Sequence, residues 1–298
     1  MSELKGLGTA LITPFQADGS VDYKALERLL DTQLSGKVDY LVVLGTTGEA
    51  ATMTADEKRE VRRFIVNYVH QSPIPLVLGV GGNNTAAVCA ELEAIREELV
   101  RDYAAILSVC PYYNKPSQEG LFRHFCQVAE ASPIPVILYN VPGRTGVNLL
   151  PETVMRIYEA HPDKIAGIKE ASGNLAQIKD LINLANSQCT IHNAQSPFLV
   201  ISGDDGIACE LMEAGADGLI SVASNAYPED FRRIVHDHDA ALQAKYGEMI
   251  RLLFVEGNPA GIKTVLAQRG VIGNYLRLPL VPNSPAVQQQ IALAGQQL

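Results

Sequence analysis

The chain has 298 residues, of which 47% are hydrophobic and 19% are charged, and its 24 basic and 33 acidic residues give a net charge of −9. This length allows a large hydrophobic core, and the hydrophobic content excludes a disordered chain. The acidic balance argues against binding to nucleic acid or to an anionic membrane surface, because both favour a basic protein.

The N-terminus and the cysteines indicate a cytoplasmic protein. The first five residues lead directly into an apolar pattern, with no basic segment before a long apolar one, so a secretory signal is not indicated. No apolar stretch is long enough to span a bilayer. The cysteines are scattered and form no C-x-x-C pair, which favours reduced thiols: Cys89, Cys110, Cys126, Cys189 and Cys209.

Short apolar runs alternate with amphipathic helix patterns along the chain. Strands are expected at Gly6–Ile12, Tyr40–Leu44, Leu76–Val80, Ala104–Val109, Val136–Tyr139, Ile165–Lys169, Phe198–Ser202 and Gly218–Val222. Between them, helices with recognisable first residues are expected at Tyr23–Ser35 after Asp22, Ala55–Val69 after Thr54, Gln118–Ala131 after Ser117, and Glu152–His161 after Pro151. The strand runs are continuously apolar, which is typical of strands buried on both faces of a parallel sheet.

Eight strands in β–α alternation predict a (β/α)₈ TIM barrel of the α/β class, with a C-terminal helical extension. The alternative is a doubly wound open sheet, but Leu11–Phe15 offers no glycine-rich nucleotide turn after the first strand. The extension is expected to form helices over Glu229–Phe254, Pro259–Gln268 and Ser284–Ala294. We therefore predict a catalytic barrel over residues 1–226 and a helical domain over residues 227–298 that packs on it. The stretch Gln188–Pro197 before the seventh strand resembles an insertion and receives no role.

Lys169 closes the apolar run of the sixth strand. Because burying an ammonium is costly, a lysine in this position usually has a purpose, and one such purpose is to attack a carbonyl and form a Schiff base. The alternative is a strand-end lysine whose head lies in solvent. Because side chains alternate along a strand, an inward Lys169 turns Glu170 outward, so this carboxylate need not neutralise the amine.

Other strand ends add groups at the edge of the barrel where active sites lie. In Gly45–Glu49, two glycines bracket Thr46 and Thr47, which suits a turn that holds a small carboxylate and relays protons, or an ordinary capped turn. After the fifth strand, Tyr139 offers a phenol for acid–base work, and Arg144 in the following loop offers a fork for a carboxylate. The tyrosines Tyr112 and Tyr113 after the fourth strand are alternatively core or interface residues.

Three further patterns exclude other chemistries. Asp204 and Asp205 after the seventh strand would repel a phosphorylated substrate. The run Gly79–Asn84 lacks the third glycine of a dinucleotide fingerprint. His236 and His238 are two residues apart on an expected helix and so cannot share a face, which argues against a metal site.

The motifs Gly45–Glu49, Tyr139–Gly146 and Gly167–Glu170 together resemble the dihydrodipicolinate synthase family, which lies within the pyruvate-dependent class I aldolases. The resemblance covers nearly the whole chain. It implies a lyase that condenses pyruvate with L-aspartate 4-semialdehyde in diaminopimelate and lysine biosynthesis. The alternatives are another pyruvate-dependent aldolase, such as N-acetylneuraminate lyase, and a pyruvate-binding protein without catalytic activity.

The resemblance also implies catalytic roles. Lys169 would form the Schiff base with pyruvate, and Tyr139 would carry protons to and from the carbinolamine. Thr47 and Tyr113 would join Tyr139 in a proton relay, with Thr46 beside them. Of the two adjacent tyrosines, Tyr113 fits better the residue that crosses a dimer interface into the partner's site.

For substrate binding, the resemblance implies that Arg144 holds the carboxylate of the semialdehyde. Backbone at Thr46, Thr47, Gly203 and Ile220 would line the pyruvate pocket. It implies a homotetramer built as a dimer of dimers, and it requires neither a metal nor an organic cofactor.

Some members of the family are inhibited by lysine, which binds at the dimer interface through residues that include a histidine and a glutamate. Ala55, Lys58 and Ala87 stand at the matching positions here, whereas Asn83 and Tyr112 are retained. Because the acidic partner for the effector's ammonium is missing, we predict that lysine feedback is weak or absent.

Overall fold

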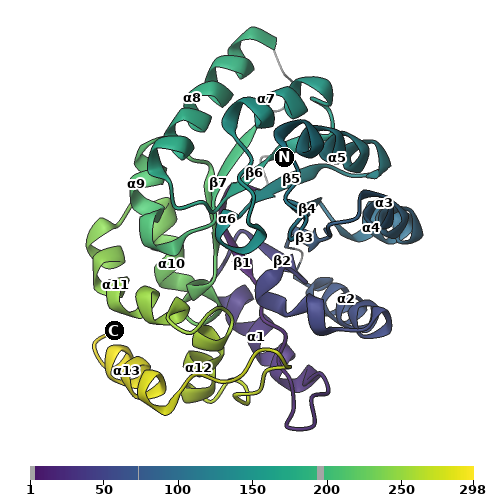
Figure 1. Cartoon of the computed structure of the whole chain (residues 1–298). Helices are drawn as coiled ribbons and strands as arrows, with labels where there is room; N and C mark the ends of the chain where they lie inside the picture. The colour runs from purple at the N-terminus through teal and green to yellow at the C-terminus, as the bar shows by residue number, and fades with distance from the viewer. Residues whose placement is uncertain (1–3, 73, 193–197) are drawn as a thin grey trace. The chain divides into compact units, whose positions relative to one another are not determined.

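Eight parallel strands, in chain order, form a closed barrel, as predicted (Figure 1). The computed structural model describes residues 4–72, 74–192 and 198–298, so residues 193–197 of the stretch Gln188–Pro197 lie outside the described residues. The strands are β1 (Gly6–Ala10), β2 (Tyr40–Val43), β3 (Leu76–Gly79), β4 (Ala105–Val109), β5 (Val136–Asn140), β6 (Ile165–Glu170), β7 (Leu199–Ser202) and β8 (Gly218–Ser221). The chain divides into two compact units, here called the central unit, mainly Pro75–Ile220, and the terminal unit, Gly6–Ile74 with Ser221–Leu298.

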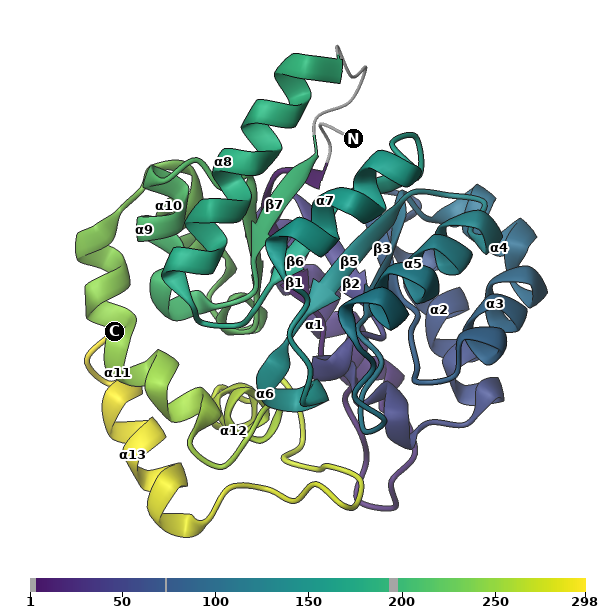
Figure 2. The ribbon, with the colours of Figure 1, turned by 45° about the horizontal axis from the view of Figure 1, so that its top comes forward.

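The central unit contains most of the barrel strands and their covering helices. The helices are α3 (Thr85–Ala94), α4 (Arg96–Asp102), α5 (Gln118–Ala131), α6 (Pro142–Thr145), α7 (Pro151–Ala160), α8 (Leu175–His192) and α9 (Ala208–Glu213). Neighbouring helices pack on one another, and α7 and α8 also contact β6 and β7 (Figure 2). The parallel register of β5 and β6 places Tyr139 beside Lys169. This pairing brings two of the predicted catalytic residues together.

The terminal unit contains the pair β1 and β2 and the helices of both ends of the chain. Its helices are α1 (Tyr23–Ser35), α2 (Ala55–Val69), α10 (Pro228–His236), α11 (Ala240–Phe254), α12 (Ala260–Gln268) and α13 (Pro285–Gly295). The last three pack on one another, and α10 packs against β1 (Figure 1). The predicted boundary between residues 226 and 227 stays a prediction.

Capping side chains fix the first residues of the helices that the sequence predicts best. Asp22 accepts a hydrogen bond from the amide of Ala25 at the start of α1, and Ser117 does the same for Gly120 in α5. Thr54 and Glu57 form the predicted reciprocal capping box of α2. These caps satisfy amides that lack a partner within the helix, which explains why α1, α2 and α5 match their predicted ranges.

The predicted single helix Glu229–Phe254 is wrong, because the chain breaks it into α10 and α11. His238 adopts a left-handed backbone with φ of 53°, and the Asp239 carboxylate accepts from the Leu242 amide to begin α11. Capping by Asp239 favours a new helix start over continuation. His236 is the last residue of α10 and His238 lies between α10 and α11, so the two histidines do not lie on one helix. The Nε2 atom of His236 lies 2.7 Å from the Asp39 carboxylate.

Candidate active site

The amine of Lys169 is buried at the carboxyl end of β6. The residue is only 6% exposed, and its Nζ lies 4.4 Å from the centre of the Tyr139 ring on β5. Close approach of β6 to β7 depends on Gly167, since a Cβ there would lie 2.2 Å from the Leu199 carbonyl oxygen. The alternative of a lysine head in solvent is therefore wrong, and the amine lies against a phenol ring.

Glu170 is fully buried and bonded to groups other than the neighbouring lysine. Its carboxylate accepts hydrogen bonds from Asn140 Nδ2 at 2.8 Å, Gln177 Nε2 at 3.2 Å and the Ser172 amide at 2.6 Å. The carboxylate of Glu170 is thus bound by neutral donors and not by Lys169, as expected if the two side chains point to opposite faces of β6. Sequence reasoning missed Asn140 and Gln177; a polar residue at a buried strand end is the signal that points to Asn140.

Backbone from β7 closes tightly on the lysine side chain. A Cβ at Gly203 would lie 2.9 Å from Lys169 Cε and 2.7 Å from Ala171 Cβ. The Gly203 amide donates to the Glu170 carbonyl at 2.8 Å, which fixes this approach. Ile220 is buried on β8. Gly203 therefore lies against the amine-bearing side chain, as a residue lining its pocket would.

The loop after β4 presents Tyr113 on the surface of the single chain. Tyr113 is 88% exposed and has a φ of 73°, which is unusual for a residue with a bulky side chain. Asn83 supports the loop: its Nδ2 donates to the Tyr112 carbonyl at 3.2 Å, and its carbonyl accepts from Asn114 Nδ2 at 3.0 Å. The hydrogen bonds of Asn83 thus stabilise a loop backbone that exposes the Tyr113 ring to solvent in the single chain.

Arg144 lies on the short helix α6 and not in an irregular loop as predicted. Pro142 at the first position presets the helical backbone, and Gly146 ends the turn with a φ of 72°. The Arg144 side chain is exposed. Because the backbone of Arg144 belongs to a defined helical turn, its guanidinium can reach fewer positions than it could from an irregular loop.

In the terminal unit, Thr46 and Thr47 lie in a single 3₁₀ turn over Thr46–Gly48. Thr46 is exposed, whereas Thr47 is only 3% exposed. The Thr47 hydroxyl oxygen accepts a hydrogen bond of 3.0 Å from Asn258 Nδ2, and the Thr13 hydroxyl donates to the Gly48 carbonyl at 2.7 Å. Sequence reasoning missed Asn258, which lies 211 residues further along the chain.

The same turn ends in a buried ion pair that sequence reasoning also missed. Glu49 pairs with Lys263 of α12, and both side chains are fully buried. The Lys263 Nζ also donates to the Tyr275 carbonyl at 3.0 Å and lies 4.3 Å from the centre of the Phe15 ring. Burial lowers the pKa of Lys263 to about 8. The Arg277 amide donates to Glu49 at 3.1 Å, so the turn is tied both to α12 and to the segment that follows it.

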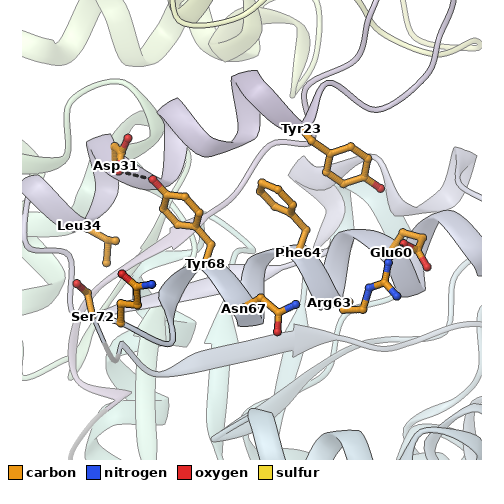
Figure 3. A pocket seen from close by; sticks show the side chains of 10 residues that line it. Tyr23, Asp31, Leu34, Glu60, Arg63, Phe64, Asn67, Tyr68 and Ser72 are labelled. Carbon is orange, nitrogen blue, oxygen red and sulfur yellow. Dashed lines mark hydrogen bonds and ion pairs between the residues drawn. The ribbon is translucent and has the colours of Figure 1, made fainter.

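A hollow of about 700 Å³ between α1 and α2 does not coincide with these groups (Figure 3). The described residues that line it include none of the predicted site residues. The hydroxyl of Tyr68 donates to the Asp31 carboxylate, which raises the pKa of Tyr68 to about 12. Two pairs of its polar side chains, Tyr68 with Asp31 and Arg63 with Glu60, therefore bind each other.

The described part of the chain offers neither a cluster of metal ligands nor a membrane-spanning helix. No group of three or more histidine, cysteine, aspartate or glutamate side chains could hold a metal ion in residues 4–72, 74–192 and 198–298. Over the same ranges, no helix combines the length and the apolar character needed to cross a membrane.

A closed parallel barrel with a buried amine against a tyrosine ring at a strand end is typical of lyases that act through a Schiff base, the class I aldolases. The profile of the dihydrodipicolinate synthetase family matches residues 3–297. The chain belongs to this family.

Individual relatives agree with the family assignment. A 4-hydroxy-tetrahydrodipicolinate synthase of Parabacteroides distasonis is 48% identical over 99% of this chain and 97% of its own length. The dihydrodipicolinate synthase structure from Thermotoga maritima superposes with a TM-score of 0.90 at 37% identity, covering 98% of each chain. The Acinetobacter baumannii synthase, solved in complex with pyruvate, gives a TM-score of 0.90 at 36% identity over 99% of this chain and 98% of that one.

Proposed function

We propose that the chain is a 4-hydroxy-tetrahydrodipicolinate synthase, which condenses pyruvate with L-aspartate 4-semialdehyde on the route to diaminopimelate and lysine. The observation that carries the proposal is the buried Lys169 amine, 4.4 Å from the centre of the Tyr139 ring. Full-length relatives with this activity in their names support it.

In the first half of the reaction, the amine of Lys169 acts on pyruvate. The lone pair of the neutral amine attacks the keto carbon. The resulting carbinolamine loses water as its hydroxyl takes a proton from Tyr139, which leaves an imine. The imine withdraws electrons from the adjacent methyl group, so a methyl proton departs and an enamine forms.

In the second half, the enamine carbon attacks the aldehyde carbon of the semialdehyde, and the aldehyde oxygen takes up a proton. Arg144 holds the carboxylate of this substrate through its guanidinium fork. The amino group of the bound substrate then attacks the imine carbon. The ring closes as the bond to Lys169 breaks, and the free amine is restored.

Thr47, Tyr113 and Tyr139 form the proton relay, with Thr46 beside them, and backbone at Gly203 and Ile220 lines the pyruvate pocket. The chain acts as a homotetramer, a dimer of dimers, in which Tyr113 reaches the partner's site; the exposure of its ring in the single chain supports this assembly. The cytoplasm is its location, supported by the four free cysteines among the described residues.

Borohydride reduction in the presence of pyruvate tests the proposal, because it fixes a Schiff base as a stable adduct. We expect one added three-carbon unit on the peptide that contains Lys169, and none in a Lys169→Ala variant. Lys164→Arg is the matched control, since Lys164 precedes the opposite end of β6 and its Nζ donates to the Ser132 carbonyl at 3.0 Å. An adduct that persists in Lys169→Ala would contradict the assignment.

Turnover distinguishes the synthase from other pyruvate-dependent aldolases. The same preparation should consume aspartate semialdehyde with pyruvate and should leave N-acetylneuraminate uncleaved. Cleavage of the sugar acid without semialdehyde turnover would place the chain with the alternative aldolases. An unreactive Lys169 would indicate a binding protein instead.

A further inference from the structure

The Thr47 hydroxyl receives a hydrogen bond whose direction is set by chemistry. Asn258 is 7% exposed, and its Nδ2 lies 3.0 Å from Thr47 Oγ1. An amide NH₂ group can only donate, so the threonine oxygen is the acceptor in this contact. The single proton of the Thr47 hydroxyl is therefore left to point away from Asn258.

The turn that carries Thr47 is held in place by other contacts. The Thr13 hydroxyl donates to the Gly48 carbonyl at 2.7 Å. Glu49 forms the buried pair with Lys263 and accepts from the Arg277 amide. With the backbone anchored on both sides, the bond from Asn258 acts on the orientation of one hydroxyl and is not needed to hold the turn.

We propose that Asn258 is a positioning residue that orients the Thr47 hydroxyl as a proton donor toward the relay. This inference rests on the proposed function, because it takes the relay role of Thr47 as given. Under this proposal, the segment that precedes α12 influences proton transfer through Thr47, although this segment lies far in sequence from the barrel motifs. Asn258 acts through Thr47 and touches no reacting atom.

Two substitutions at this position separate orientation from packing. Asn258→Ala removes the donor, and we expect kcat to fall about tenfold with the KM for pyruvate within about twofold, the size expected for loss of one hydrogen bond. Asn258→Asp keeps the shape but accepts at neutral pH, so the Thr47 proton turns toward the carboxylate. We expect this variant to lose about 100-fold in kcat, within the range of a general acid–base contribution.

The pH profile gives a readout that a packing role would not change. When the aspartic acid of Asn258→Asp takes up a proton, it can again donate to Thr47, so its kcat relative to wild type should rise as the pH falls. The charged groups on the surrounding segments, Glu49, Glu256, Lys263 and Arg277, are the same in both proteins and cancel in this ratio.

A double substitution and a control complete the test. In a Thr47→Val background, Asn258→Ala should lower kcat no further, because the oriented hydroxyl is already gone. Asn283→Ala is the matched control: Asn283 is a buried asparagine of the C-terminal region whose Oδ1 accepts from the Thr264 hydroxyl at 2.9 Å. It should lower the unfolding temperature and leave kcat unchanged.

The outcomes separate the two proposals. Failure of wild type to form an adduct at Lys169 would overturn the proposed function, and the inference with it. If wild type is active, then wild-type kcat in both Asn258 variants would overturn the inference alone. An Asn258→Asp to wild-type ratio independent of pH, or additive losses with Thr47→Val, would also overturn it. Circular dichroism confirms that each variant is folded before its kinetics are compared.

Discussion

Replacing Gly203 with alanine should displace the reactive amine without removing any functional group. The added Cβ would lie 2.9 Å from Lys169 Cε and 2.7 Å from Ala171 Cβ, whereas carbon atoms in contact prefer about 3.5–4.0 Å. Relief requires a shift of roughly 1 Å, and misplacement by this distance costs about 100-fold in rate. Overpacking of this kind also destabilises by about 1–3 kcal/mol.

The assay is the time course of borohydride-trapped adduct, together with kcat. Gly203→Ala should slow both by about 100-fold while the protein stays folded. Gly247→Ala is the control, because a Cβ at this position of α11 meets nothing within 4 Å. That variant should gain about 0.5–1 kcal/mol of stability at unchanged activity. Wild-type trapping in Gly203→Ala would refute the argument that this glycine makes room for the lysine.

Three further predictions concern pH, the buried ion pair and feedback. Burial lowers the pKa of His124 to about 4 from 6.5, so the unfolded chain binds more protons between these values, and stability falls as the pH drops through this window. His124→Gln should reduce that loss by about 3 kcal/mol in urea titrations; equal slopes for both proteins would contradict this. Lys263→Met leaves Glu49 buried without its cation and should destabilise by about 3–5 kcal/mol, measured in the same way. Lysine at millimolar concentration should leave the activity unchanged, because Ala55, Lys58 and Ala87 provide no acidic partner for its ammonium; half-inhibition below a millimolar would show this wrong.

The sequence predicts the barrel well because its signals are local. Apolar runs mark the strands within one or two residues, and capping residues mark α1, α2 and α5. The break between α10 and α11 was not predicted, because the helical spacing of apolar residues continues from one helix into the next. The signal was Asp239, three residues after the last residue of α10, whose side chain caps the start of α11.

The residues of the candidate site also fall into those that a local sequence pattern predicts and those that it does not. Lys169 and Tyr139 follow from strand alternation, since each closes a predicted strand. Asn258 and Lys263 depend on contacts between segments more than 200 residues apart, which no local pattern encodes. Lys263 nevertheless carried a signal, because a lysine within the apolar run Ala260–Val265 poses the same burial problem as Lys169.

The tetrapeptide Ala-Gly-Ile-Lys occurs twice, ending at Lys169 and at Lys263. In both copies, a side chain on the glycine would collide with a backbone oxygen, at 2.2 Å for Gly167 and 2.4 Å for Gly261. One copy presents its amine to a phenol ring, and the other seals its amine inside an ion pair. Lys263 is therefore an internal control for the reactivity of Lys169. If an electrophile labels Lys169 and not Lys263, the difference comes from the surroundings of the two amines, because the tetrapeptide is the same in both places.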